Sequence, residues 1–268
     1  MEIHIPAYAL DPLQGFLDYW ENSRRLLDLS IEGLTILKDV PSILEGVRQQ
    51  NEHIRTARKM LKDSTIVEPP PEELLLEMIK NAQAKADFSE KEIKSGFPLL
   101  HAQTLVGAWG ALEAAIEDML VGILVNELQH LQQEAFGRIR VPLAEFEGLD
   151  KEERMRFLIE EINRSDSLSR KNGVDAFEAL LEKFLLSGAL NAEVKKTLWE
   201  INHIRNVIVH RNSLADRRLV KSCQWLKLKV GDRVIVVHDQ LERYGQALSG
   251  YVKTIIGRLE NRYKVIHS

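Results

Sequence analysis

Three polar side chains suited to phosphodiester chemistry lie close together in one apolar segment, Ile204–Asn212. Arg205 carries a permanently charged, planar guanidinium, which binds a phosphate through two parallel hydrogen bonds. His210 carries an imidazole, a type of side chain that can exchange a proton with a hydroxyl group near neutral pH. Asn206 adds a carboxamide that donates and accepts hydrogen bonds. These residue types predict a catalytic site that needs no cofactor and no metal.

Helical geometry aligns only two of the three side chains. At about 100° per residue, Asn206 and His210 share one face, whereas Arg205 points about 140° away from His210. We therefore expect a homodimer in which two such helices share a cleft and each copy supplies what the other lacks. The alternative is structural: Arg205 forms a salt bridge, and His210 interacts with the helix dipole at the C-terminus.

Apolar residues at helical spacing predict a mainly α protein. Asn191 is the expected N-cap of a helix from about Ala192 to Val209 or His210, which carries the three polar side chains. Upstream, residues 99–134 read as one long helix with an apolar stripe. Further helices are expected at residues 12–40, 42–62, 71–94, 151 onward, 174–186 and 239–263.

Two carboxylates, Glu113 and Glu117, lie one turn apart beside the apolar stripe of the long helix. They are interpreted either as a solvated edge or ion pairs to basic neighbours, or as groups of which one orients a catalytic residue. His101, His203 and His238 are interpreted as structural.

A change of period follows the polar segment. Trp225–Val230 alternates apolar and basic residues, Gly231-Asp232 suits a two-residue turn, and Arg233–Val237 is β-prone, so a small β-hairpin is expected near residues 225–237. Basic side chains also gather in the chain directly after His210, and they are interpreted either as a patch that steers RNA or as a solvated surface. They are Arg211, Arg217, Arg218, Lys221, Lys227 and Lys229.

A triple proline at Pro69–Pro71 predicts a boundary, because such a run cannot continue a helix. We expect an N-terminal helical hairpin at residues 1–70, followed by a helical domain at residues 71–268.

The composition limits which functions and cellular locations are expected for this protein. The 268 residues carry a formal net charge of −4, so RNA binding requires a local basic patch. Cys223 is the single cysteine, which excludes a disulfide within the chain and favours a reducing compartment. We find neither a secretory signal nor a stretch of about 18 apolar residues, so a cytoplasmic protein without a membrane partner is expected.

The segment Arg205–His210 resembles the Arg-X4-His motif, often Arg-Asn-X3-His, of the HEPN superfamily. Trp109–Glu113 in the upstream helix is similar to the first core helix of bacterial HEPN proteins of the ribonuclease LS and stress-response type. Gly231–Val234, followed by an amphipathic C-terminal helix, is also similar to that group. The resemblance covers roughly residues 72–268.

The resemblance implies a HEPN-like helical bundle and a homodimer with the motif helices at its interface. It also implies metal-independent cleavage of RNA to 2′,3′-cyclic phosphate ends, in a toxin with an antitoxin partner or in an antiviral-defence effector. Arg205 would contact the scissile phosphate, His210 would act as general base or acid, and Asn206 would orient His210 or the phosphate. The alternative is a non-catalytic HEPN-like module for dimerisation or for binding a nucleotide or partner.

Overall fold

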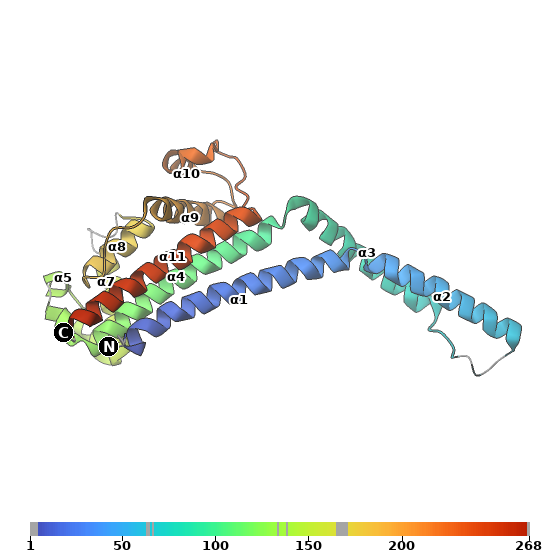
Figure 1. Cartoon of the computed structure of the whole chain (residues 1–268), viewed down its shortest axis with the longest axis horizontal. Coiled ribbons are helices and arrows are strands. Elements are labelled where there is room, and N and C mark those ends of the chain that lie inside the picture. The colour runs from blue at the N-terminus through green and yellow to red at the C-terminus, as the bar shows by residue number, and fades with distance from the viewer. Residues whose placement is uncertain are drawn as a thin grey trace. The chain divides into compact units, whose positions relative to one another are not determined.

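The protein is mainly helical, as predicted (Figure 1). The computed structural model describes residues 5–62, 65, 67–132, 134–137, 139–164 and 171–266. The long helices are α1 (Ala7–Leu37), α2 (Val40–Leu61), α3 (Glu72–Ser95), α4 (Pro98–Asn126), α7 (Lys151–Arg164), α9 (Ala192–His210) and α11 (His238–Ile266). Shorter ones are η1 (Leu128–Gln132), α5 (Glu134–Gly137), α6 (Leu143–Gly148), α8 (Val174–Glu182), α10 (Arg217–Ser222) and η2 (Gln224–Leu226). No helix within these ranges has both the length and the apolar content to cross a membrane.

The chain divides into two compact units, residues 25–100 and residues 1–24 with 101–268. In the first unit, α2 and α3 pair as a hairpin, which Arg48 and Arg58 fasten through ion pairs to Glu72 (3.0 Å) and Glu68 (2.7 Å). Pro69–Pro71 lies in the connection of this hairpin, directly before α3. The separate domain expected at residues 1–70 stays a prediction.

Close helix contacts at glycine build the core of the second unit. A Cβ at Gly122 of α4 would lie 2.3 Å from the backbone oxygen of Tyr8, and a Cβ at Gly245 of α11 would lie 1.8 Å from the ring of Trp20. Only glycine permits these approaches, so α1 packs directly on both helices. Buried apolar residues of both helices contribute to this core, among them Leu112 and Ile116 of α4 and Leu248 and Ile255 of α11.

Three buried or largely buried glutamates fasten α11 to the rest of this unit. Each accepts a hydrogen bond from a tyrosine of α11 and pairs with an arginine of the same helix. Glu200 pairs with Tyr244 and Arg243, Glu178 with Tyr251 and Arg258, and Glu127 with Tyr263 and Arg262. A carboxylate removed from water is tolerated only when it is paired and hydrogen-bonded, so these contacts fix α11 in its position.

The predicted β-hairpin near residues 225–237 is wrong, since the residues described there contain no strand. Residues 224–226 form η2, and Lys227 adopts a left-handed conformation (φ 54°) that interrupts the expected extended segment. The segment after Gly231 pairs instead with the chain that follows α9: Val234 N donates to Ser213 O (2.8 Å), and Ala215 N donates to Asp232 O (2.8 Å). The hydrogen-bonding partners of this β-prone sequence are therefore distant in the chain.

Candidate functional site

The helix α9 begins and ends as the sequence predicts. Asn191 Oδ1 accepts hydrogen bonds from the backbone N–H groups of Glu193 (2.9 Å) and Val194 (3.4 Å), which confirms the N-cap. The helix ends at His210, after which Asn212 and Ser213 take left-handed conformations and reverse the chain. His210 therefore lies on the last turn, exposed to solvent.

One face of α9 is fixed to the core. Leu198, Ile201 and Ile204 are buried, and the fully buried carboxylate of Glu200 accepts hydrogen bonds from Tyr244 Oη (2.6 Å) and Trp225 Nε1 (2.5 Å). Burial opposes ionisation of Glu200, but these hydrogen bonds and the charge of Arg243 outweigh it and lower its pKa. The opposite face of the helix is thereby held in one orientation.

That opposite face lines a hollow with a volume of about 780 Å³. Asn206 and His210 both line it, as their four-residue spacing predicts. We call this hollow the α9 cleft. Its other lining residues are Asn172, Trp199, Asn202, His203, Val207, Arg211, Asp216, Arg218 and Ser222.

Arg205 does not line the α9 cleft with the other two motif residues. Its Nη1 donates a hydrogen bond to Asn206 Oδ1 (3.2 Å), and its Nη2 lies 3.6 Å from Glu113 Oε2 on α4. Glu113 in turn accepts a hydrogen bond from Trp109 Nε1 (2.8 Å). Arg205 thus lies between the cleft and α4: it donates a hydrogen bond to the carboxamide oxygen of Asn206 and pairs with Glu113.

The ion pair of Glu113 with Arg205 fits both interpretations of that carboxylate, because Arg205 is itself a candidate site residue. Glu117 forms an ion pair with Arg156 of α7 (3.1 Å). That contact fits the structural interpretation of Glu117 as a partner of a basic neighbour.

His203 is the site residue that sequence reasoning missed. It lines the α9 cleft, its Nε2 is buried without a hydrogen-bonding partner, and its ring packs edge-on against Trp199 at 5.1 Å. Burial lowers the pKa of His203, with Asp216 opposing and Arg218 reinforcing the shift. The signal was its spacing, since Trp199, His203, Asn206 and His210 recur every three or four residues on one face.

The basic residues after α9 divide between the cleft and the open surface. Arg211 and Arg218 line the cleft, and Asp216, the acidic residue facing them, accepts the Leu219 N–H as the N-cap of α10 (2.8 Å). Within the described part of the chain, neither arginine forms an ion pair, so both guanidinium groups are available to an anion. Arg217, Lys221, Lys227 and Lys229 are exposed outside the cleft.

The buried Cys223 is not a candidate nucleophile. Burial, aided by the charge of Glu200, raises the pKa of its thiol to about 12, so it carries no thiolate near neutral pH. Among the residues that the structure describes, no group of three or more His, Cys, Asp or Glu side chains is arranged to hold a metal ion.

Comparison with protein-family models, with curated proteins and with solved structures found no match. The geometry of the α9 cleft and the motif resemblance are therefore the two indications of function.

Proposed function

We propose that the protein is a HEPN-like, metal-independent endoribonuclease whose site is the α9 cleft. The observation that carries the proposal is the placement of Asn206 and His210 on one wall of a hollow that also contains the free guanidinium groups of Arg211 and Arg218. A proton-exchanging imidazole beside two cations is the chemistry that cleavage of a ribose phosphodiester requires.

The reaction transfers one proton and exchanges one phosphorus–oxygen bond. His210 accepts the proton of the ribose 2′-hydroxyl, and the 2′-oxygen bonds to the adjacent phosphorus. The bond from phosphorus to the 5′-oxygen of the next nucleotide breaks, and His210 returns the proton to that oxygen. The products are a 2′,3′-cyclic phosphate and a 5′-hydroxyl end. Arg211 and Arg218 neutralise the charge that develops on the phosphoryl oxygens.

Arg205 has two candidate roles in this scheme. Within one copy it positions Asn206 through the 3.2 Å hydrogen bond. In a homodimer with adjoining α9 helices, as the motif resemblance implies, Arg205 of one copy would instead contact the phosphate in the cleft of the other. Mixing the Arg205→Ala and His210→Ala proteins distinguishes these roles. A shared cleft regains activity in the mixed dimer, whereas a cleft within one copy does not.

Cleavage of structured RNA in EDTA tests the proposal. The wild type is expected to produce 5′-hydroxyl and cyclic phosphate ends, and the His210→Ala variant to lose at least about a hundredfold in rate. Lys253→Ala, an exposed substitution on α11 outside both the cleft and the basic cluster, is the control and should retain full activity. Circular dichroism verifies folding. Equal cleavage by wild type and His210→Ala would refute the assignment, because a contaminating nuclease explains that result.

As a toxin or antiviral effector, the protein should slow the growth of a host that expresses it. The His210→Ala form should not, and co-expression of an antitoxin partner should restore growth.

A non-catalytic nucleotide- or partner-binding module is the second candidate. It is favoured by the engagement of the Arg205 guanidinium with Asn206 and its proximity to Glu113, away from the cleft. Binding of RNA without any cleavage by the wild type would select this alternative.

A further inference from the structure

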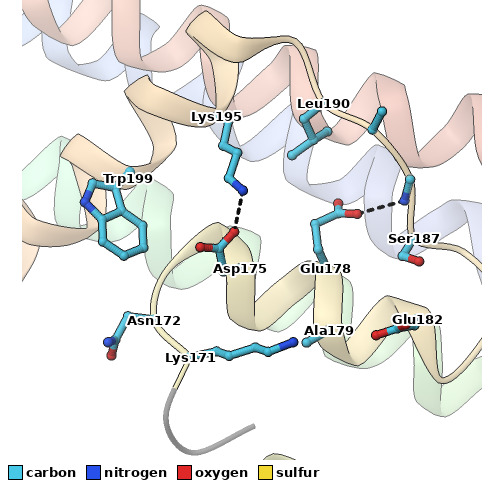
Figure 2. A pocket seen from close by; sticks show the side chains of 12 residues that line it. Lys171, Asn172, Asp175, Glu178, Ala179, Glu182, Ser187, Leu190, Lys195 and Trp199 are labelled. Carbon is cyan, nitrogen blue, oxygen red and sulfur yellow. Dashed lines mark hydrogen bonds and ion pairs between the residues drawn. The ribbon is translucent and has the colours of Figure 1, made fainter.

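A second hollow, with a volume of about 670 Å³, adjoins the α9 cleft. Trp199 and Asn172 line both hollows and therefore mark the passage between them. Figure 2 shows Trp199 at one end of the second hollow, beside Asp175 and Asn172, with Glu182 at the opposite end. A ligand that extends beyond the cleft along α9 thus meets the Trp199 ring.

The second hollow is unsuited to a phosphate. One of its two lysines, Lys195, is neutralised by Asp175 at 2.9 Å. Glu178 is paired in turn with Arg258, but Glu182 adds a carboxylate that repels an anion. Its cations therefore do not outnumber its acids, in contrast to the α9 cleft with Arg211 and Arg218.

The same lining suits an uncharged, planar heterocycle with polar edges. Trp199 is partly exposed, and its packing against His203 holds the indole in place. Stacking on an aromatic side chain is the usual way in which an unpaired base is bound. The Asn172 carboxamide supplies a donor and an acceptor to the edge of a base, and carboxylates such as Asp175 accept its N–H groups.

We propose that Trp199 is the stacking platform for one unpaired nucleobase of a single-stranded RNA, with Asn172 at the edge of that base. The inference rests on the proposed function, because it places the sugar-phosphate chain in the α9 cleft. Trp199 and His210 are separated by about 16 Å along the helix. The stacked base therefore belongs not to the reacting nucleotide but to one further along the strand, and the second hollow recognises RNA beyond the cleavage point.

Binding of a non-cleavable RNA tests the platform apart from catalysis. The probe is a fluorescein-labelled hexanucleotide of 2′-O-methyl RNA, which lacks the attacking hydroxyl, together with six versions in which one nucleotide at a time is abasic. Fluorescence anisotropy gives the dissociation constants for wild type, Trp199→Ala and Trp199→Phe. Circular dichroism and thermal unfolding verify that each variant is folded.

For the wild type, one abasic position is expected to weaken binding about tenfold, and Trp199→Ala to weaken the intact probe by a similar factor. In Trp199→Ala the same abasic position should cause no further loss of affinity, because the base of the intact probe already has no ring to stack on. Trp199→Phe, which keeps an aromatic face, should retain most of the affinity and most of the abasic effect.

The platform is overturned if Trp199→Ala binds the intact probe as tightly as wild type, or if its abasic profile is unchanged. If the wild type cleaves no RNA but the abasic effect still depends on Trp199, the nuclease proposal is refuted and the base site stands. If the wild type cleaves RNA but the abasic effect does not depend on Trp199, the base site is refuted and the nuclease proposal stands. If no oligonucleotide binds even at low salt, both proposals fail.

Discussion

The substitution Glu200→Gln tests whether the buried carboxylate holds α9 in place. The carboxylate accepts hydrogen bonds at both oxygens, from Tyr244 Oη and Arg243 at Oε1 and from Trp225 Nε1 at Oε2. Glutamine keeps the shape but places an amide NH₂ against one of these donors. One hydrogen bond to a charged group contributes about 1.5–3 kcal/mol, and an unsatisfied buried donor costs about 1–3 kcal/mol. Together these contributions predict that the free energy of unfolding falls by about 2.5–6 kcal/mol.

Urea unfolding followed by circular dichroism at pH 7 measures this change. The matched control is Glu242→Gln on α11, next to Arg243, which also removes an acid but breaks only a surface ion pair with Arg24 (3.0 Å). Its effect should be about 0–1 kcal/mol. If Glu200→Gln unfolds within about 0.5 kcal/mol of the control, the carboxylate does not fix the helix and the reasoning fails.

The pH dependence supplies an internal check. The pKa of Glu200 in the folded protein lies below its ordinary value of 4.5, so the charged form is favoured by folding. This contribution is present above pH 4.5 and is lost as the pH falls through the lowered pKa. The difference between wild type and Glu200→Gln should therefore be full at pH 7 and narrow below pH 4.5.

Two further predictions concern packing and titration. Gly122→Ala should lower the free energy of unfolding by about 1–3 kcal/mol, because its Cβ would meet the Tyr8 backbone oxygen. Gly110→Ala lies in the same helix, and nothing lies within 4 Å of its new Cβ, so it should raise the free energy of unfolding by up to about 1 kcal/mol. Thermal unfolding of both variants tests whether one loses stability and the other gains it. Because burial lowers the pKa of His203 below 6.5, its unfolded state binds the proton first, and stability should fall by up to about 1.4 kcal/mol per pH unit below 6.5. His203→Gln should flatten the curve as the pH falls below 6.5, and an unchanged slope there would contradict the assignment.

Features with local causes were predictable from the sequence. Asn191 caps α9 through its own side chain, and Asp150 and Glu153 exchange hydrogen bonds at the start of α7. Each interaction spans at most three residues, so its signal lies within one short window. The shared face of Asn206 and His210 likewise follows from helical periodicity.

Features with distant causes were not predictable. The direction of the Arg205 guanidinium depends on Glu113 of α4, and no local spacing encodes that contact. The extended segment after Gly231 finds its partners at residues 213–215, so alternation of apolar residues alone suggested the wrong pairing. The α9 cleft itself is closed by Asn172 and Arg218, which come from separate segments of the chain.

The unequal spacing of the α11 tyrosines has a consequence for how this helix reaches its final alignment. Tyr244 and Tyr251 are seven residues apart, whereas Tyr251 and Tyr263 are twelve apart. If α11 slid along its neighbours during folding, no displaced register would return the tyrosine partner to more than one of the three glutamates, and the other two would lose the hydrogen bond that a tyrosine of α11 donates. Each displaced alignment of α11 is therefore less stable than the native one. Only the native alignment forms all three tyrosine–glutamate contacts together.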